Sequence, residues 1–303
     1  MSTPALRTFA LTKHFGDTRA LTNLEFEVEA GEVVGCLGPN GAGKTTLIRL
    51  LLGLLIPSSG RAEIFGLDSH RHTVEAHAHL AYVAGEANLW PTLTGAETLH
   101  LLAQIQGHVD DAYRDVLVDR FELDVSKKVR ALSKGNRQKL ILIGALMTRP
   151  DLLILDEPTS GLDPLMEQAF RACIGEARER GQSVLLSSHI LSEVEALCDR
   201  IGILREGVLV EIGTLAQMRH LSALLIEATF DGAVPDLTRV DGVSLVEVTG
   251  SSLTCQVHGS VEPLLRALLD ANVRSLLSRE PSLEELFLSH YGVGASERAS
   301  DVT

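Results

Sequence analysis

The segment GPNGAGKT, Gly38–Thr45, constrains the fold of this chain more than any other stretch. It follows the apolar run EVVGCL and precedes TTLIRLLLGLL, which is rich in residues that favour a helix. A strand, a glycine-rich loop and a helix in this order match the P-loop pattern, in which backbone N–H groups and a helix N-terminus surround a phosphate. The fixed positions would match by chance in about one chain in a hundred of this size. We therefore predict an α/β nucleotide-binding core.

The residues of this loop have expected places around the phosphates of ATP. Lys44 reaches the β- and γ-phosphates, and the Thr45 hydroxyl is a ligand of Mg²⁺. The glycines let the backbone turn its N–H groups toward the β-phosphate. The residues that we expect to bind ATP here are Gly38, Asn40, Gly41, Gly43, Lys44, Thr45 and Thr46.

A second chemical signal is the run LLILDEP, Leu152–Pro158, an apolar strand that ends in two adjacent acids. Adjacent residues of a strand point to opposite sides, so one acid can face a metal while the next faces the γ-phosphate. We expect Asp156 to hold Mg²⁺ through water and Glu157 to polarise the attacking water. An Asp-Glu pair is more often an ordinary turn, but a P-loop in the same chain favours hydrolysis.

Composition and charge limit the partners of the chain. With 303 residues and 45% hydrophobic content, it is long enough for one large core and a small second domain. Its formal net charge of -13 offers no clustered positive charge for nucleic acid or an anionic lipid surface. The most apolar run, Leu47–Ile56, is too short to cross a bilayer, and the N-terminal segment has no signal-peptide pattern. We expect a cytosolic chain whose contact with a membrane runs through a protein partner.

The texture of the sequence predicts two domains and a tail. Short apolar strands alternate with helices over residues 1–218, which indicates a mainly parallel sheet covered by helices. Within this domain, residues 86–150 lose the strand signal and are expected to form a helical insertion. Residues 219–292 suggest a small α+β domain of order β-α-β-β-α-β, closed by a helix at PSLEELFL, and residues 293–303 suggest a flexible tail.

Three further motifs follow in a fixed order: LSKGN at Leu132–Asn136, SGLD at Ser160–Asp163 and SSH at Ser187–His189. Together with the P-loop and LLILDEP, they make about the first 215 residues resemble the ATP-binding subunits of ABC transporters. The resemblance implies a P-loop NTPase core with an N-terminal antiparallel β subdomain and a helical insertion. It also implies an ATPase with Mg²⁺ as its cofactor.

The resemblance assigns further roles by position. Ser133 and Gly135 correspond to the signature residues that contact the γ-phosphate held by the other subunit of a dimer. Asp163 belongs to the D-loop that contacts this partner, and His189 corresponds to the switch histidine that senses the γ-phosphate. Phe15 corresponds to the aromatic residue that stacks on adenine. Taken singly, Ser133 is an ordinary helix N-cap, His189 a surface residue and Phe15 a core aromatic.

The chain departs from the family pattern at two places. The family usually has a glutamine after the strand that here reads AYVAG, where it helps to coordinate Mg²⁺, but this chain has Gly85 followed by Glu86. Either Glu86 takes over as a ligand, or metal coordination at this position is weaker. In the signature segment, Lys134 adds a fixed positive charge near the phosphate held across the dimer, and asparagine stands at the fifth position.

The C-terminal domain resembles the extension of ATPases from drug- and antibiotic-export systems, including the daunorubicin-resistance type, in which the permease is a separate chain. This resemblance implies an exporter subunit on the cytoplasmic side of the membrane, which dimerises on MgATP with a second copy or a paralogous ATPase. The groove for a permease helix is expected around Leu89–Thr94. An ABC ATPase that acts on ribosomes or DNA is disfavoured by the single cassette and the acidic charge. A regulatory or nucleotide-gated module without a permease remains open, because Gly85 weakens the match.

Overall fold

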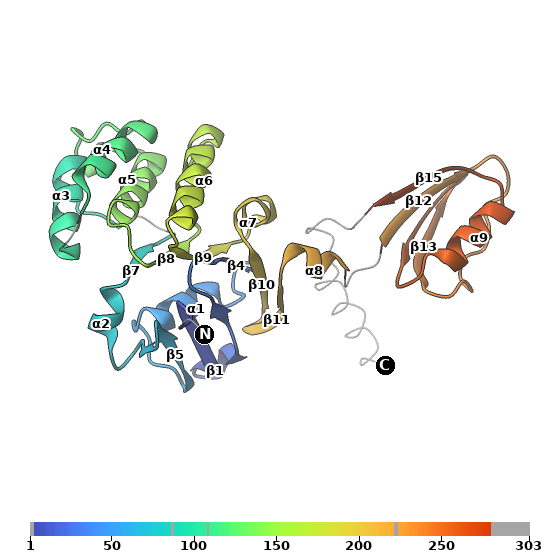
Figure 1. Ribbon diagram of the computed structural model, residues 1–303, viewed down its shortest axis with the longest axis horizontal. Helices are drawn as coiled ribbons and strands as arrows, with labels where there is room; N and C mark the ends of the chain where they lie inside the picture. Colours follow the sequence, from blue (N-terminus) through green and yellow to red (C-terminus); the bar gives the residue numbers. More distant parts are fainter. Residues whose placement is uncertain (1–2, 86–87, 108, 221–223, 280–303) are drawn as a thin grey trace. The chain divides into compact units, whose positions relative to one another are not determined.

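The computed structural model describes residues 3–85, 88–107, 109–220 and 224–279 of the chain (Figure 1). Its contacts divide the chain into two compact units, Met1–Ile212 and Gly213–Thr303. The sequence pattern of strands and helices had suggested a domain boundary slightly later, after residue 218. The second unit begins with helix α8 (Leu215–His220), whose Met218 is buried.

A mainly parallel sheet forms the centre of the first unit. Its strands lie in the order β11 (Val208–Gly213), β10 (Arg200–Arg205), β4 (Val33–Leu37), β9 (Ser183–Ser188), β8 (Leu152–Asp156) and β7 (Leu80–Val83). All pairs from β10 to β7 are parallel. Every residue of β4, β8 and β9 is buried, as expected for continuous apolar strands that are covered on both faces.

Parallel pairing brings the carboxyl ends of three strands to one edge of this sheet. Leu37 pairs with Ser188, and Asp156 pairs with Ser187. The loops after β4, β8 and β9 therefore leave the sheet next to one another, at the edge where open α/β sheets bind their ligands. These three loops carry the P-loop, the acid pair and the SSH motif.

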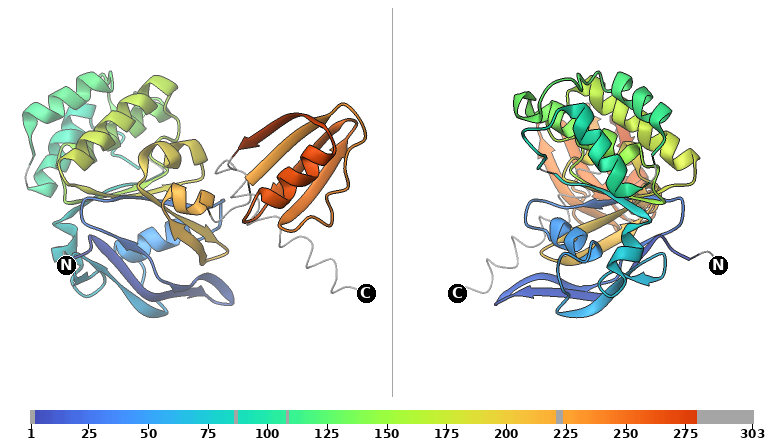
Figure 2. Two further views of the ribbon diagram at one scale, coloured as in Figure 1. Left: turned by 45° about the vertical axis from the view of Figure 1, so that its right-hand side comes forward. Right: turned by 90° about the vertical axis from the view of Figure 1, so that its left-hand side faces the viewer.

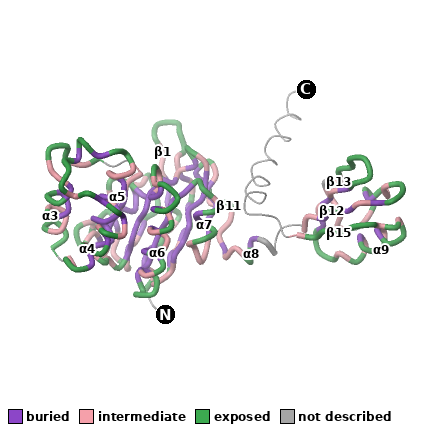
Figure 3. The backbone as a smooth tube through the Cα atoms, turned by 90° about the horizontal axis from the view of Figure 1, so that it is seen from above, coloured by how far each residue is buried: buried purple, intermediate pink, exposed green. Residues whose placement is uncertain are grey.

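Helices cover both faces of the parallel sheet (Figure 1). On one face, Val33, Val184 and Leu186 pack with α3 (Gly95–Gln106), α4 (Asp111–Arg120), α5 (Lys134–Leu146) and α6 (Pro164–Glu179). On the other face, Val34 and Leu185 pack with α1 (Lys44–Leu51). This alternation is the period of two expected of a strand, and it concentrates the buried residues along the sheet (Figure 3).

An antiparallel sheet packs on the far side of α1. Its strands are β2 (Thr18–Leu24), β1 (Leu6–Phe15), β5 (Ser59–Ile64) and β6 (Leu67–Asp68), and β3 (Glu27–Val28) also pairs with β1. Leu6, Leu21 and Ile64 share one core with Leu47 of α1. The short helix α2 (Thr73–His77) then leads to β7.

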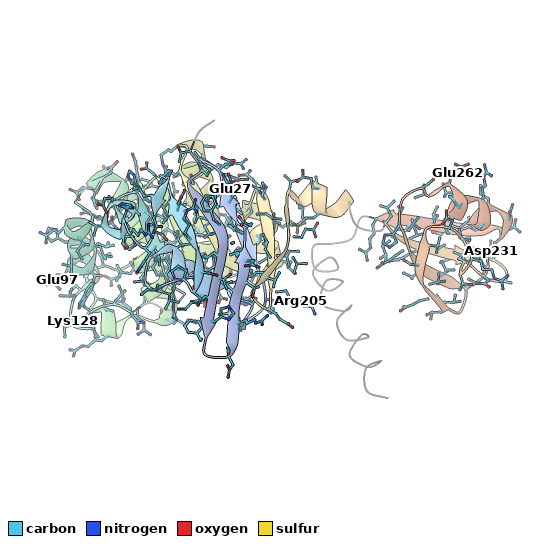
Figure 4. All side chains as sticks on the ribbon, turned by 90° about the horizontal axis from the view of Figure 1, so that it is seen from below. Glu27, Glu97, Lys128, Arg205, Asp231 and Glu262 are labelled. Atoms are coloured by element: carbon cyan, nitrogen blue, oxygen red, sulfur yellow. The ribbon has the colours of Figure 1, made fainter. Side chains whose placement is uncertain are left out.

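The segment between β7 and β8 forms the helical insertion. It contains α3, α4, the 3-10 helix η1 (Val129–Ala131) and α5, and its described residues, 88–107 and 109–150, include no strand. Thr94 begins α3 with a capping box, in which Thr94 and Glu97 each accept a hydrogen bond from the backbone of the other. Thr94 also bridges to Lys128, so Glu97 and Lys128 lie at the same end of the insertion (Figure 4).

The second unit is a smaller α+β structure (Figure 2). An antiparallel sheet of order β13 (Val243–Thr249), β14 (Ser252–Val257), β12 (Leu224–Phe230) and β15 (Val273–Arg279) carries α9 (Glu262–Asp270) on one face. Ile226, Phe230 and Leu253 of the sheet pack with Leu264 and Leu268 of the helix.

The first helix of the expected β-α-β-β-α-β order, at PDLTRV (residues 235–240), is not formed. Between β12 and β13, residues 231–242 make turns, in which the N–H and hydroxyl of Thr238 both donate to the Asp236 carboxylate. Such local side-chain hydrogen bonds compete with a helix, and the PDLTRV segment is too short to overcome them. The closing helix expected at residues 281–288 and the tail at 293–303 lie outside the described residues.

The predicted fold class is confirmed: a P-loop α/β core with an antiparallel β subdomain, a helical insertion and a small C-terminal α+β unit. Within the part of the chain that the structure describes, no helix is both long enough and apolar enough to span a membrane.

Candidate active site

The loop between β4 and α1 has a conformation that requires glycine at several positions. Gly41 and Gly43 have φ angles of 84° and 110°, in the left-handed region that glycine adopts freely. A Cβ at Gly43 would lie 2.7 Å from the carbonyl oxygen of Ala20 in β2. A Cβ at Gly38 would lie 2.5 Å from the carbonyl oxygen of Leu204 in β10. The loop is therefore held tightly between the two sheets of this unit.

Lys44 lies across this loop at the start of α1. Its ammonium group donates to Gly38 O at 2.5 Å and to Pro39 O at 3.1 Å, and its side chain is almost fully buried. Most of the expected ATP-binding residues of the loop line one cleft: Asn40, Gly41, Gly43, Lys44, Thr45 and Thr46, together with Glu157. Gly38 is buried beneath the loop. The other wall of the cleft comes from Thr18, Arg19 and Ala20 of β2.

Thr45 and Asp156 bring oxygen atoms together beside this cleft. Thr45 Oγ1 donates to Asp156 Oδ2 at 3.2 Å, and the Ser187 hydroxyl donates to the other oxygen of the same carboxylate. A hydroxyl and a carboxylate are donors of the kind that Mg²⁺ prefers. Among the described residues, no group of three or more His, Cys, Asp or Glu side chains is placed to hold a metal. Thr45 and Asp156 therefore fit a Mg²⁺ ion that takes its other ligands from phosphate and water, which is how this ion usually binds.

Glu157 stands at the end of β8, where three clefts meet. It lines the P-loop cleft, a second cleft with Thr45 and Gly85, and a third with His189. Its φ angle is 47°, a left-handed conformation that is uncommon for a residue with a Cβ, and its N–H donates to Ser187 O at 3.0 Å. Glu157 Oε1 lies 3.0 Å from His189 Nδ1. The predicted hydrolytic pair is therefore in direct contact.

The signature segment packs on the D-loop of the same chain. Ser133 is the N-cap of α5, and its hydroxyl accepts a hydrogen bond from Asn136 N at 3.2 Å. A Cβ at Gly135 would lie 2.5 Å from Gly161 O, which explains the glycine at this position. Lys134 Nζ donates to Ser160 Oγ at 3.1 Å. Among the described residues that line the P-loop cleft, neither Ser133 nor Gly135 is found.

Asp163 has a structural task within its own chain. It is the N-cap of α6, and its carboxylate accepts hydrogen bonds from Leu165 N at 3.1 Å and Met166 N at 3.0 Å. Pro164 at the first position of the helix and an aspartate cap are a typical helix start. The contact of Asp163 with a second subunit stays a prediction.

Phe15 and Gly85 differ in how closely they approach the site. Phe15 lies at the β1–β2 turn, is 47% exposed and has Lys13 Nζ 5.0 Å from its ring centre. It does not line the P-loop cleft among the described residues, although Thr18 of the same hairpin does. Gly85 lies directly on the site, because a Cβ there would be 3.2 Å from Asp156 O. Glu86, the other metal ligand that we considered, lies outside the described residues.

Comparison with known proteins settles the family of the chain. Residues 21–160 match the family model described as "ABC transporter". The chain is 34% identical over 305 residues to the daunorubicin resistance ATP-binding protein DrrA3 of Streptomyces coeruleorubidus, which covers 95% of this chain and 96% of that protein. The chain belongs to the ABC transporter ATP-binding proteins.

Two further matches give the extent of this relationship. The chain is 38% identical over 218 residues to the probable multidrug ABC transporter ATP-binding protein YbhF of Escherichia coli (strain K12), covering 70% of this chain but only 38% of YbhF. A solved structure described as the ATP binding subunit of an ABC transporter superimposes with a TM-score of 0.67 and 33% identity. It covers 71% of this chain and 92% of that chain. The enzyme class expected from the motifs, an ABC ATPase, is thereby confirmed at the level of the family.

The structure adds contacts at the site of this ABC protein that the motifs did not assign. Ser187 donates to Asp156, and Ser188 contacts the buried Glu193. Arg49 of α1 lines the same cleft as Thr45, Gly85 and Asp156. The available signals were the two serines that end an apolar strand and the lone arginine of an apolar helix. Neither signal indicates what the side chain contacts, because the contacts depend on how the strands and helices pack.

Proposed function

We propose that this chain binds MgATP, hydrolyses it, and passes the resulting movement to a separate membrane permease. The observation that carries the proposal is the position of Glu157, which borders the P-loop cleft and contacts His189. A carboxylate at this point is within reach of a water molecule beside the terminal phosphate of a nucleotide in the cleft. General bases of this kind contribute about 10²–10⁴-fold to a reaction rate.

The residues around Glu157 divide the work of the reaction. Backbone N–H groups of the loop and the Lys44 ammonium bind the phosphates. Thr45 and Asp156 would hold Mg²⁺, which neutralises charge on the phosphate oxygens when bound. Glu157 accepts a proton from the attacking water, and His189 orients the Glu157 carboxylate through the 3.0 Å contact.

Dimerisation on ATP is the second part of the proposal. Ser133 and Asp163 are exposed, and beside Asp163 the apolar side chain of Leu165 is 71% exposed. The start of α5 at Ser133 presents backbone N–H groups that can bind an anion. A second copy or a paralogous ATPase that brings its ATP to this helix start would cover all three residues. Lys134 would then lie close to the bound phosphate and favour it through its charge.

An apolar groove on the helical insertion supports docking of a permease helix. It has a volume of ≈ 270 Å³ and is lined by Leu89, Trp90, Leu102, Ile141 and Ala145, among others. Trp90 is 47% exposed and Ile105 of the nearby α3 is 65% exposed. A groove of apolar side chains with an exposed tryptophan suits the apolar face of an amphipathic helix. Through such a contact the chain would lie at the cytoplasmic side of the membrane.

The relatives suggest what the permease transports. YbhF is named as a probable multidrug transporter protein, and DrrA3 is named for daunorubicin resistance. DrrA3 matches this chain over both units. We propose that the transported molecules are drugs or antibiotics and that the direction is export.

Affinity purification tests this proposal. Tagged Glu157→Gln protein is isolated from membranes of its host with MgATP, and the proteins that accompany it are identified by mass spectrometry. A stoichiometric polytopic membrane protein is expected. A Trp90→Ser variant should lose this partner while it still binds ATP, because Trp90 lies in the groove and not in the P-loop cleft. Recovery of ribosomal proteins, DNA-repair proteins or no partner would favour an ABC ATPase or a regulatory module without a permease.

A further inference from the structure

Glu193 is a buried acid to which the proposed reaction gives no role. It lies in α7 (Leu191–Leu197), between β9 and β10, and is only 3% exposed. One carboxylate oxygen, Oε2, accepts a hydrogen bond from Ser188 Oγ at 2.5 Å, and the other, Oε1, has no hydrogen-bond partner among the described residues. Burial raises the pKa of the Glu193 carboxyl, although the hydroxyls of Ser188 and Thr159 lower it in part. Burying an acid in this way is unfavourable, so its position needs a reason.

The hydrogen bond to Ser188 fixes the turn that carries His189. Ser188 Oγ also accepts a hydrogen bond from Ile190 N at 2.9 Å, so this hydroxyl ties together the residues before and after His189. With its donor hydrogen directed to Glu193, the Ser188 hydroxyl keeps a lone pair for Ile190 N–H. The conformation of the Ser188–Ile190 turn therefore depends on an acceptor at position 193.

The helix that carries Glu193 is packed against β4 and β9. Val194, the next residue, is fully buried over Gly35 of β4, where a Cβ would come within 2.5 Å of Val194 Cγ1. Cys198, just after the helix, would lie 3.0 Å from the same Cβ. Because Gly35 is three residues before the P-loop, α7 is anchored to the strand that also positions the phosphate site. Glu193 thus links His189 to a rigid part of the core.

Glu193 also borders the space next to the reacting residues. The cleft on this side of the site is lined by Glu157, Thr159, His189 and Glu193, among other residues. An acid in the first turn of a helix can simply stabilise the helix N-terminus. An exposed side chain in the first turn would also serve that purpose. The burial of Glu193 and its contact with Ser188 point to a task at the His189 turn.

We propose that Glu193 is a positioning residue for hydrolysis: it orients the Ser188 hydroxyl, which holds the Ser188–Ile190 turn and keeps His189 in contact with Glu157. The inference rests on the proposed function, since it concerns the rate of ATP hydrolysis. It assigns Glu193 no contact with ATP. Loss of Glu193 should therefore affect the chemical step and leave nucleotide binding to the P-loop unchanged.

The test measures kcat and KM for MgATP hydrolysis, the affinity for ATP and the melting temperature of five variants. In Glu193→Ala, kcat should fall about tenfold or more, while KM and ATP affinity change less than about twofold. Glu193→Gln should keep kcat within about threefold of the unchanged protein, because its amide oxygen can accept the Ser188 hydrogen bond. Ser188→Ala should resemble Glu193→Ala, and the double variant should lose no more activity than either single one. The control Glu195→Ala changes an exposed residue of the same helix and should leave kcat unchanged.

Each outcome of this experiment supports or overturns the inference about Glu193. An active Glu193→Ala protein with normal kcat overturns the inference, as do equal changes in KM and kcat or additive losses in the double variant. If Glu193→Ala does not fold, Ser188→Ala and Glu193→Gln carry the same test. If the wild-type protein binds ATP but does not hydrolyse it, both the proposed function and this inference are overturned. Hydrolysis by the unchanged protein with no effect of the variants would overturn the inference alone.

Discussion

Glu157 Oε1 lies 3.0 Å from His189 Nδ1, and the two residues follow strands that are neighbours in the parallel sheet. The contact is a consequence of strand register, because Asp156 of β8 pairs with Ser187 of β9 and both strands end at the same edge of the sheet. Glu157 N–H also donates to Ser187 O at 3.0 Å, which extends the pairing by one step. The backbone of the sheet therefore sets the distance between the proposed general base and the residue that orients it.

Glu157→Gln should nearly abolish hydrolysis and leave ATP binding intact. The amide has the shape of the carboxylate but cannot accept a proton from water, so the rate should fall about 10²–10⁴-fold. Steady-state ATPase assays and equilibrium ATP titrations measure the two effects. The variant should also collect as a dimer in saturating MgATP, which size-exclusion chromatography with light scattering detects.

The matched control for this change is Glu179→Gln, which alters an exposed glutamate of α6 in the same unit. It should leave both rate and affinity unchanged. A Glu157→Gln protein that hydrolyses ATP at the normal rate would show that another group acts as the base. A monomer in saturating MgATP would count against the dimeric sandwich.

Lys44→Ala should weaken ATP binding by at least about tenfold. The Lys44 ammonium lies at the P-loop, and a hydrogen bond to a charged group contributes about 1.5–3 kcal/mol. Isothermal titration with ATP measures the loss, and Lys127→Ala, which removes an exposed lysine of the helical insertion, is the control for net charge. A normal affinity for ATP in the Lys44→Ala variant would show that Gly38–Thr45 is not the phosphate-binding loop.

The sequence was sufficient for the parts of the site that depend on local patterns. β4, β8 and β9 were predictable because each contains an apolar run, and all their residues are buried. The P-loop was predictable because its backbone needs glycine where φ is positive, as at Gly41 and Gly43. The order of motifs then indicated the family, and with it the roles expected for Ser133, Asp163 and His189.

Contacts that depend on how strands and helices pack could not be predicted from local patterns. Ser188 and Glu193 are five positions apart but meet only because α7 folds back against β4. Thr45 and Asp156 were both assigned to Mg²⁺ from their own motifs, but their direct hydrogen bond, between residues 111 positions apart, depends on the sheet topology. The expected helix at PDLTRV failed for a local reason, because the Asp236 carboxylate takes the N–H and hydroxyl of Thr238 and forms a turn.

Gly85→Gln should change the dependence of the ATPase on Mg²⁺. A side chain at this position starts 3.2 Å from Asp156 O, so an amide oxygen can reach the metal side of the cleft. We expect half-maximal activity at a Mg²⁺ concentration lower by about threefold or more, because an oxygen ligand is added. Gly85→Ala is the matched control, since it adds the same Cβ contact without the amide. Identical Mg²⁺ titrations of the two variants would show that position 85 is not linked to the metal in this chain.

Glu193→Gln should gain stability relative to the unchanged protein as pH rises. Burial raises the pKa of Glu193 above its ordinary value of 4.5, and the nearby charge of Glu167 adds a smaller increase. The hydroxyls of Ser188 and Thr159 and the charge of Arg171 lower the pKa, but by less. The folded protein therefore holds this proton to a higher pH than the unfolded chain, so stability is lost as pH rises from about 4.5 through the folded pKa. Glutamine does not ionise, and the variant escapes this loss. Urea unfolding of both proteins from pH 5 to pH 8 measures the difference in unfolding free energy, which should grow in favour of the variant and then level off. A difference that stays constant would mean that Glu193 ionises as easily in the folded protein as in the unfolded chain.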